Sequence, residues 1–410
     1  MSIIPQIQAH MSNITSQWYG IERDSSIASP DWVRIAGCKS AMDLHRTLPA
    51  QNLLKGCVIS HGTKNVNYYL YPTDWSKKAD GVTASDLTGT DGNVCVRKTA
   101  PLYWRYETIG TIQRIKVSLL PLPGFVKSDI WNYSSYEGFK DASNKLCSFA
   151  GVLPTTSVSE TNFRTYARAN GAGYEQQWYS PYKELVYLLI MEYATNNIQK
   201  PVNANLTAQG YKQGGLGNGV TTAVDAEWNT YNGRNPFIIC GTSDSLANGS
   251  GEVSAVITNF GGAGVNRTFT VPRYRGTENV FGHIWKWTDG CTINNLADRR
   301  EAYIFDNPAN FADGTSTGAR LVGLLPTDTG GWIKTILFGA NGDILPASVG
   351  GSSTTQFCDY FYAPALGGGW RALLCGGTAR SSADAGVLCA TVGNSAANPV
   401  TYIGSRLIIQ

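Results

Sequence analysis

Apolar and polar residues alternate over short stretches in the first 125 residues of the chain. At positions 114–119, for example, Ile, Val and Leu alternate with Arg, Lys and Ser, and this period of two is typical of a half-buried strand. Similar short runs, including WVRIAG, LLKGCVIS and NVCVRK, are separated by Gly, Asp and Pro residues that favour turns. The pattern predicts a small all-β domain over residues 1–125.

The segment LPLPGF, at positions 120–125, marks a change in this pattern. Its two prolines restrict the backbone, and the composition changes after it, so we place a domain boundary between residues 125 and 126. Residues 210–266 are dense in Gly, Asn and Thr, and few regular elements are expected there. Short strands separated by loops are expected from residue 303 onward.

Two stretches of the second region have the spacing and the end signals of helices. The first, around 159–169, has Thr161 or Asn162 as its predicted N-cap. The second, SPYKELVYLLIMEYATNN, has Ser180 as its predicted N-cap and a proline at the first helical position. Leucines share one side of this second stretch, so we predict a core helix that ends near Asn196.

The C-terminal residues 367–410 combine a regular frame of Gly and Ala with chemically unrelated residues between them. From 378 to 385, small residues alternate with mixed ones, and in an extended strand one set packs inward while the other faces outward. Such a mixed polar surface is suited to adaptable ligand contacts. The predicted ligand-binding positions are Thr378, Arg380, Ser381, Ser382, Asp384, Cys389, Thr391, Val392, Gly393, Asn394, Asn398, Val400 and Tyr402.

The frame WRALLxGG, AxAG and IGSR resembles the variable region of the target proteins of diversity-generating retroelements, a group that includes phage tropism determinants. In addition, RGTENVFGHIWKWTDG, at 275–290, resembles the glycine, amide and tryptophan signature of the C-type-lectin and formylglycine-generating-enzyme superfamily. The resemblance implies a C-type-lectin fold that displays rewritten positions as a binding surface. Trp285, Trp287 and Trp370 are predicted to belong to the structural core.

Together, the pattern and the resemblance imply a β-rich α+β protein. A small all-β domain (1–125) precedes a C-type-lectin-like domain (126–410) with few helices and many loops, whose variable region lies at about 370–406. The function implied is that of a noncatalytic phage receptor-binding protein, of tail-fibre or adhesin type, for host attachment. Two alternatives remain: a virion structural or decoration protein, and a glycan-degrading receptor enzyme.

The same resemblance implies a set of partners. The receptor is expected on the host cell surface and is either a protein or a glycan, while the N-terminal domain contacts other virion proteins. A homo-oligomer is expected, for which phage relatives suggest a trimer. With a net charge of +3 and no cluster of basic and aromatic residues, the chain is not expected to bind nucleic acid.

The composition and the N-terminal sequence bear on disorder, secretion and membrane insertion. With 42% hydrophobic and 15% charged residues, the chain is not expected to be disordered. The N-terminal MSIIPQIQAHMSNITSQ lacks a basic region and an apolar core, and the chain has no apolar run long enough to span a bilayer. We therefore expect synthesis in the host cytoplasm without a signal peptide, no membrane insertion, and a final place in the virion.

Catalytic and metal chemistry find little support in the sequence. Nine scattered cysteines without a CxxC pair, and four histidines, indicate neither a zinc site nor a disulfide framework. Cys375 and Cys389 lie in the region where the oxidase of the resembled superfamily, the formylglycine-generating enzyme, carries its reactive thiols. However, Cys375 ends an apolar run, and Cys389 is one of the positions predicted to vary. The usual calcium-ligand pattern of lectins is missing. No cofactor and no metal are expected.

Hydrolysis of a glycan would require two carboxyl groups about 5 to 10 Å apart. No spacing in the sequence selects a pair, and the expected role of Glu278 and Asp289 is to accept hydrogen bonds from backbone donors in a loop-rich core. The available carboxylates are Glu278, Asp289, Asp306 and Asp313.

Overall fold

The computed structural model describes residues 17–37 and 39–410. The first 16 residues of the predicted N-terminal domain, and Cys38, lie outside the described residues. The chain is β-rich with few helices, in agreement with the predicted α+β, β-rich class. Among the described residues, no helix is long and apolar enough to cross a membrane.

The first sheet contains mostly strands from the N-terminal part of the chain. Trp18 and its neighbours are opposite the stretch 112–118, where the sequence predicts a half-buried strand, and this prediction is confirmed. The five strands occur in the order β2 (Val33–Ala36), β1 (Trp18–Asp24), β8 (Ile112–Ser118), β7 (Leu102–Ile109) and β9 (Val126–Ser128).

The second sheet combines strands from both sides of the predicted boundary at residue 125. Asn132 of its third strand is opposite Arg97 on one side and Ile409 on the other, and the hydrophobic core also continues across the boundary. The predicted parts 1–125 and 126–410 are therefore joined by backbone hydrogen bonds and a common core. The strand order is β13 (Tyr174–Gln176), β28 (Leu407–Ile409), β10 (Asn132–Ser134), β6 (Asn93–Lys98), β3 (Leu54–Ile59), β4 (Val66–Tyr71) and β5 (Asp74–Lys78).

The largest sheet is built around one long strand, β19 (Trp285–Asn295). Its neighbour β25 carries the WRALL frame, and the pairing shifts in register between Trp287 and Thr292. β27 (Ile403–Gly404) pairs with β19 in parallel. The strand order is β21 (Arg320–Leu325), β20 (Arg300–Ile304), β19, β25 (Gly369–Cys375), β26 (Ala390–Thr391), β24 (Tyr360–Tyr362), β22 (Gly330–Ile336) and β23 (Pro346–Val349).

Smaller sheets complete the β structure. One has three strands, in the order β16 (Gly251–Ile257), β17 (Arg267–Tyr274) and β18 (Thr277–Glu278). Two others are pairs of very short strands, β11 (Phe139–Lys140) with β12 (Leu146–Cys147), and β14 (Val202–Asn203) with β15 (Gln213–Gly214).

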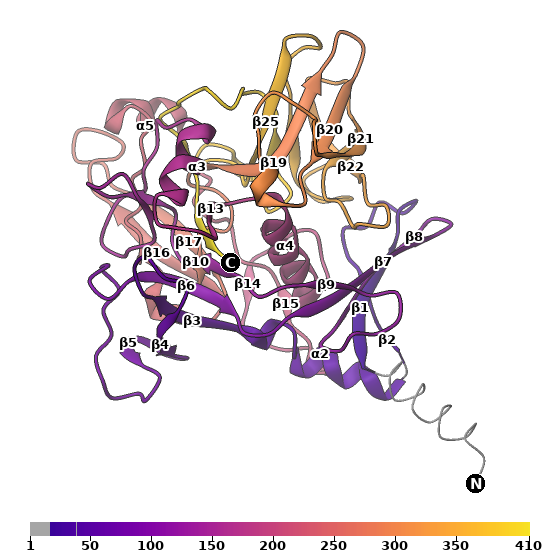
Figure 1. The fold of residues 1–410 in the computed structure, drawn as a ribbon, viewed down its shortest axis with the longest axis horizontal. Coiled ribbons are helices and arrows are strands. Elements are labelled where there is room, and N and C mark those ends of the chain that lie inside the picture. The colour runs from indigo at the N-terminus through magenta and orange to yellow at the C-terminus, as the bar shows by residue number, and fades with distance from the viewer. Residues whose placement is uncertain (1–16, 38) are drawn as a thin grey trace.

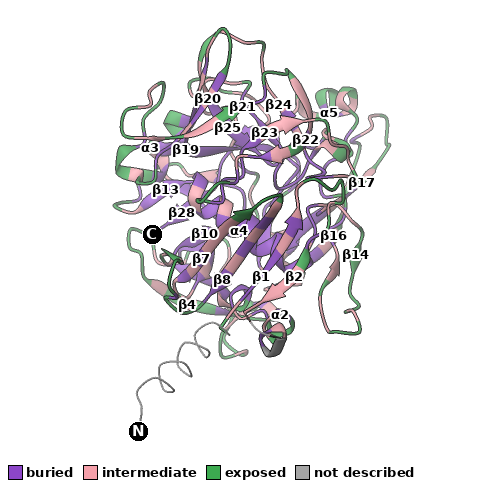
Figure 2. Cartoon of the chain, turned by 90° about the vertical axis from the view of Figure 1, so that its right-hand side faces the viewer, coloured by how far each residue is buried: buried purple, intermediate pink, exposed green. Residues whose placement is uncertain are grey.

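Helix α4 (Tyr179–Tyr193) is the central helix of the core. Every residue from Glu184 to Tyr193 is buried, and the helix lies between the N-terminal strands and the sheet of β19, β20 and β25 (Figure 1). Figure 2 shows buried residues gathered along the strands and helices of the interior and exposed residues mainly in the peripheral loops. The core helix is therefore confirmed, and its apolar residues surround the helix because strands pack on more than one side.

The predicted ends of the helices are wrong by a few residues. The N-cap of α4 is Trp178 rather than Ser180, and the helix ends when Ala194 adopts a left-handed conformation, before Asn196. The N-cap of α3 (Glu160–Arg168) is Ser159, whose hydroxyl accepts a hydrogen bond from the backbone N–H of residue 162. The predicted caps failed because several neighbouring Ser, Thr and Asn residues are equally good caps by sequence.

Two further α-helices within the described residues were not predicted. α5 (Asp225–Asn232) lies inside the region that is dense in Gly, Asn and Thr, and it ends at Gly233, which has a φ of 69°. α2 (Asp43–Thr47) is a single short turn near the N-terminal sheet. Both are too short and too polar for a helical period to stand out in the sequence.

Candidate functional site

Residues 376–402 do not form the predicted alternating strand. β25 ends at Cys375, and the two following glycines have φ values of 99° and 78°, which turn the chain away from the sheet. A short 3₁₀ helix, η5 (Ser382–Asp384), then occupies the centre of the stretch for which a period of two was predicted. Thr378 of the predicted outer set is buried, and Ala383 of the inner set is exposed, so this prediction is wrong.

Four predicted ligand-binding positions are buried: Thr378, Cys389, Thr391 and Val392. For Cys389, Thr391 and Val392 the cause is the strand β26 (Ala390–Thr391), which enters the large sheet between β25 and β24, so that Thr391 is opposite Leu374. Side chains enclosed by the sheet cannot contact a ligand. The remaining positions are exposed or half-buried, and they are Arg380, Ser381, Ser382, Asp384, Gly393, Asn394, Asn398, Val400 and Tyr402.

Two frame glycines of the same segment, Gly377 and Gly386, have no room for a side chain. A Cβ atom on Gly386 would lie 1.9 Å from a carboxylate oxygen of Asp359, which itself accepts a hydrogen bond from the backbone N–H of Leu388 at 2.6 Å. At Gly377 an added Cβ would lie 2.8 Å from the side chain of Ala385, and the φ of 78° also favours glycine. Substitution at these positions must therefore displace neighbouring atoms.

Arg380 and Tyr402, from the two ends of the segment, meet at the start of α5. The guanidinium of Arg380 lies 5.1 Å from the centroid of the Tyr402 ring and 2.7 Å from a carboxylate oxygen of Asp225. Asp225 also accepts two hydrogen bonds from Arg234 at 2.8 Å. The hydrogen bond from Arg234, followed by that from Arg380, lowers the pKa of Asp225 to about 2, so the cluster stays charged at neutral pH.

Other exposed positions are held by their own local contacts. The hydroxyl of Ser381 accepts a hydrogen bond from the backbone N–H of Thr378 at 2.9 Å. Further along, the Ser395 hydroxyl donates to the side-chain oxygen of Asn398 at 2.8 Å. The backbone carbonyl of Val400 accepts from the N–H of Ser157 at 2.9 Å. The backbone of the segment is therefore fixed while several of its side chains reach solvent.

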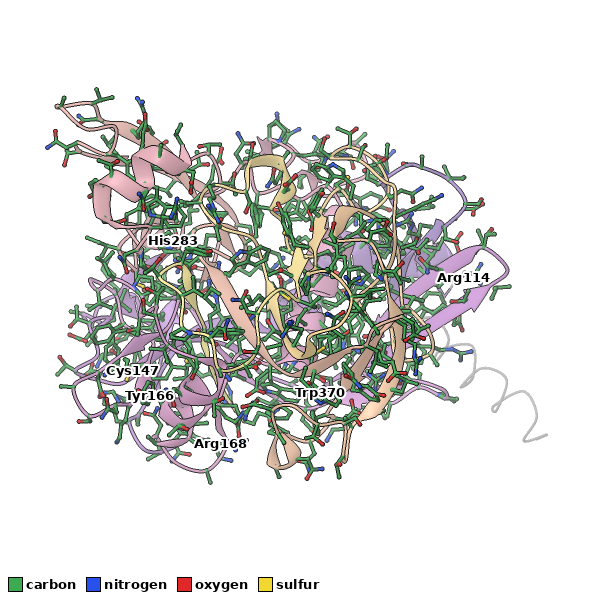
Figure 3. All side chains as sticks on the ribbon, turned by 90° about the horizontal axis from the view of Figure 1, so that it is seen from above. Arg114, Cys147, Tyr166, Arg168, His283 and Trp370 are labelled. Carbon is green, nitrogen blue, oxygen red and sulfur yellow. The ribbon has the colours of Figure 1, made fainter. Side chains whose placement is uncertain are left out.

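The three predicted core tryptophans have two different environments. Trp285 and Trp287 are buried in β19, and the Trp287 indole donates to the backbone carbonyl of Val158 at 3.1 Å, as expected for a core residue. Trp370 is only half-buried, so its placement in the core was wrong. It is labelled in Figure 3 on the same side of the molecule as Arg168 of α3, and its ring centroid lies 6.0 Å from that of Tyr303.

Trp370 lines a pocket of about 220 Å³ at the end of the large sheet. The pocket is formed by the start of α3, the middle of β19, the start of β25 and the loop at 395–397. Asp289 and Asp313, two of the four carboxylates considered from the sequence, are brought together here with Glu160. Glu160 was missed, because an acidic residue in the first turn of a helix is already explained by the helix dipole.

Arg164 connects the two aspartates of this pocket. Its Nε lies 2.6 Å from Asp289 Oδ2, and its Nη2 lies 2.7 Å from Asp289 Oδ1 and 2.6 Å from Asp313 Oδ1. Gln176 and the backbone N–H of Gly290 donate to the remaining positions on Asp289 at 2.9 and 2.7 Å. The Asp289 carboxylate is therefore saturated with donors and is held in one orientation.

Glu160 has the opposite environment. The residue is 3% exposed, and its Oε1 atom is buried without a hydrogen-bond partner among the described residues. Burial, reinforced by the charges of Asp289 and Asp313 and only partly offset by Arg164, raises the pKa of Glu160 well above its ordinary value. The protonated form of this carboxyl is therefore favoured to higher pH than in an exposed glutamate.

The other groups weighed for chemistry lie elsewhere. Glu278 is buried and accepts hydrogen bonds from the backbone N–H groups of Gly241 and Ser243 at 3.0 and 2.7 Å, which is the structural role expected from the sequence. The side chain of Asp306 is 64% exposed beside Arg320. Neither residue lines the pocket that holds Asp289.

The thiols of Cys375 and Cys389 lack the surroundings of a reactive nucleophile. Cys375 and Cys389 are both buried, and burial raises the pKa of each thiol, that of Cys375 to about 12. A thiol with such a pKa is not ionised at neutral pH and is a poor nucleophile. Within residues 17–37 and 39–410, no group of three or more His, Cys, Asp or Glu side chains could hold a metal ion.

No protein-family model and no curated protein matches this chain. The residues themselves are the evidence for its function. They provide an exposed C-terminal segment and a small pocket with a buried carboxyl whose pKa is raised, and both are suited to binding a ligand.

Proposed function

We propose that this protein is a noncatalytic receptor-binding protein of a phage particle, with its ligand-binding surface on the exposed positions of residues 376–402. A C-type-lectin-like fold for residues 126–410 belongs to the same proposal. The support is the resemblance of the frame WRALLxGG, AxAG and IGSR to the variable regions of retroelement target proteins, together with the division of that segment into enclosed and exposed positions.

One observation carries the proposal: enclosed and exposed positions lie interspersed within a single segment. Gly377 and Gly386 have no room for a Cβ atom, whereas the side chains of Arg380, Ser382 and Asn398 are exposed. Replacements at exposed positions usually alter the free energy of unfolding by less than about 0.5 kcal/mol. Exposed side chains can therefore be exchanged for others while the enclosed residues keep the backbone in place.

The chemistry of the exposed set suits adaptable recognition. Arg380 and Tyr402 form a preordered cation–π pair, and these are residue types that often dominate binding energy. Ser382, Gly393 and Asn398 are small and polar, so a single copy should bind weakly. Useful adhesion would then require several copies of the chain in one particle, held together through the N-terminal part and acting by avidity.

Sequencing the 3′ end of the gene, with several kilobases downstream, in many sibling genomes tests the proposal. Substitutions should concentrate at the exposed positions Arg380, Ser382, Gly393 and Asn398, and a near-copy with adenines at the variable codons should lie nearby. The buried positions Thr378, Cys389, Thr391 and Val392 provide the matched control and should vary much less.

Two results would contradict the proposal. One is a segment that varies no more than the rest of the gene, or a gene without a neighbouring template. The other is variation that is equally frequent at buried and exposed positions, because a binding surface gains nothing from changes that it cannot display.

A further inference from the structure

Cys57 of β3 and Cys95 of β6 lie directly opposite each other in the second sheet. The two strands are adjacent and antiparallel (Figure 1), and their register pairs the two cysteines. Opposite residues of such strands point to the same face of the sheet, so both thiols lie on one face. Both residues are fully buried in one hydrophobic cluster. The fold therefore brings together two thiols that are far apart in the sequence.

The backbone hydrogen bonds of β6 show how far apart the two cysteines are. The N–H groups of Val94 and Lys98 donate away from β3, to carbonyl oxygens of other segments at 2.9 and 3.0 Å. Since the N–H groups along a strand alternate in direction, that of Cys95 points toward β3. In such a hydrogen-bonded pair the Cα atoms are about 5.5 Å apart, and the Cα atoms joined by a disulfide are most often about 5.5–6 Å apart. A disulfide can therefore span this pair.

This pairing is specific to Cys57 and Cys95. Within residues 17–37 and 39–410, the strand register places no other two cysteines opposite each other. Cys375, for example, is opposite Lys286 on one side and Ala390 on the other. A cross-link between any other two cysteines therefore has no support from the pairing of the strands.

The thiols need an opening of the sheet in order to react. Burial raises the pKa of Cys57 to about 12 and that of Cys95 well above its ordinary value, and the thiolate is the reacting form. Only β4 and β5 separate β3 from the edge of the sheet, and β4 exposes Asn67, Tyr69 and Tyr71. Edge strands with few buried side chains open more readily than the core does. Their opening exposes Cys57 first.

We propose that Cys57 and Cys95 are a redox-sensitive pair, which forms a disulfide in oxidising surroundings and returns to two thiols in reducing ones. The co-reactant is a low-molecular-weight disulfide such as oxidised glutathione. One cysteine thiolate attacks a sulfur atom of this molecule, which gives a mixed disulfide and releases one reduced glutathione. The second cysteine thiolate attacks the protein sulfur of the mixed disulfide and releases the second reduced glutathione. Two protein thiols are thereby oxidised, one glutathione disulfide is reduced, and the two thiol protons pass to the released glutathione.

The bond would act as a clamp between two central strands of the sheet. It closes a loop that contains β4 and β5, and a cross-link of this kind stabilises a fold mainly by restricting the unfolded chain. Thiols are kept reduced inside most cells and are oxidised outside them, so a chain that leaves a cell should gain the clamp after release. The inference depends on the strand register and stands apart from the proposed function.

Incubation of the folded full chain with oxidised glutathione tests the proposal, in urea below the unfolding midpoint so that the edge strands open. Free thiols are then alkylated, and tryptic peptides are mapped by mass spectrometry. Cys57 lies in the peptide 56–64 and Cys95 in the peptide 79–97. We expect these two peptides to be joined after oxidation and separate after dithiothreitol. The midpoint of urea denaturation should be higher for the joined form than for the reduced form.

Two variants serve as a matched pair. C57S should lose both the joined peptides and the difference between the two urea midpoints. C240S replaces another buried cysteine, which lies outside the strands, and should keep both. The proposal is overturned if the wild-type peptides stay separate, if Cys95 is joined to another cysteine at least as often as to Cys57, or if the joined form has the lower urea midpoint.

Discussion

Two buried glutamates in the walls of two cavities have opposite surroundings. Glu184 of α4 lines the larger cavity, of about 650 Å³, and Glu160 of α3 lines the smaller one, of about 220 Å³. No donor reaches Oε1 of Glu160 from the described residues. The carboxylate of Glu184, in contrast, accepts hydrogen bonds at 2.6–2.9 Å from Lys98, Trp104, Ser128 and Trp131.

The difference shows that cavity size alone does not identify a binding site. Although burial acts to raise it, the pKa of Glu184 lies below its ordinary value because Lys98 and the indole and hydroxyl donors stabilise the charged form. This carboxylate has no lone pair left for a ligand, and it joins α4 to strands of the first two sheets. The pKa of Glu160 is raised and its Oε1 atom has no hydrogen-bond partner among the described residues, so the smaller pocket is the stronger candidate for a binding site.

The largest effect should follow from E184A. The variant leaves the Lys98 ammonium and two indole N–H groups buried without their acceptor, and it should lower the free energy of unfolding by about 3–5 kcal/mol. Urea denaturation of the full chain measures this loss. The control E22A removes a half-exposed carboxylate that pairs with Arg114 at 2.6 Å, and its loss should stay within about 1 kcal/mol. Equal losses in the free energy of unfolding for the two variants would contradict the structural role of Glu184.

A smaller effect is expected from R164A in the other cluster. Asp289 keeps its hydrogen bonds from Gln176 and Gly290, and Asp313 can recover water because a quarter of its side chain is exposed. The free energy of unfolding should therefore fall by about 1–3 kcal/mol, measured by the same urea titration. A loss as large as that of E184A would mean that both clusters stabilise the fold equally. The contrast between the surroundings of Glu184 and Glu160 would then be contradicted.

S128A should have a smaller effect again. The Ser128 hydroxyl donates to Glu184 at 2.7 Å and accepts from Lys98 at 2.9 Å, but both partners keep their direct contact with each other. We expect a loss of about 1 kcal/mol in urea denaturation. If S128A lowered the free energy of unfolding as much as E184A, the Glu184 carboxylate would depend on the Ser128 hydroxyl alone. It would then not be held by several donors that can replace one another.

E160Q should have the smallest effect, near zero at acidic pH. The pKa of an unfolded glutamate is about 4.3, and the pKa of Glu160 in the folded chain lies above it. Between these two pKa values the folded chain holds a proton that the unfolded chain has lost, so the stability of the wild type falls as pH rises. Glutamine has no such proton. Urea titrations at acidic and alkaline pH should therefore show E160Q gaining stability relative to wild type as pH increases, and a constant difference would contradict the raised pKa.

Much of the fold could be predicted from local patterns. The period of two at 114–119 gives the strand β8, and the spacing of Trp285 and Trp287 places both rings inside the large sheet. The core helix α4 follows from its apolar run and its proline near the start. These features depend on residues that are close in sequence, which is where patterns are informative.

The C-terminal segment shows where such patterns fail. Alternation at 378–385 is compatible with a strand, but two glycines with positive φ precede it and η5 interrupts it. Alanine and serine fit a turn as well as an edge strand, so the period carried no information about backbone shape. The burial of Cys389, Thr391 and Val392 depends on pairing with β24 and β25, which no local pattern reveals.

The pocket could not be predicted at all. Arg164 and Asp289 are 125 positions apart along the chain, and they meet only because α3 packs against β19. Asp289 and Asp313 were candidates by residue type alone. That Glu160 is the unsatisfied member of the cluster depends on the positions of the donors around it, and a sequence does not contain those positions.

One measurement tests the central claim that Glu160 is the unsatisfied carboxyl and Glu184 the saturated one. Side-chain carboxyl ¹³C signals of labelled glutamates can be titrated in the full chain, with E160Q and E184Q used to assign the two signals. We predict that Glu160 titrates above the ordinary glutamate pKa of about 4.3 and Glu184 below it. If Glu160 titrates at or below that value, the contrast between the two carboxyls is contradicted.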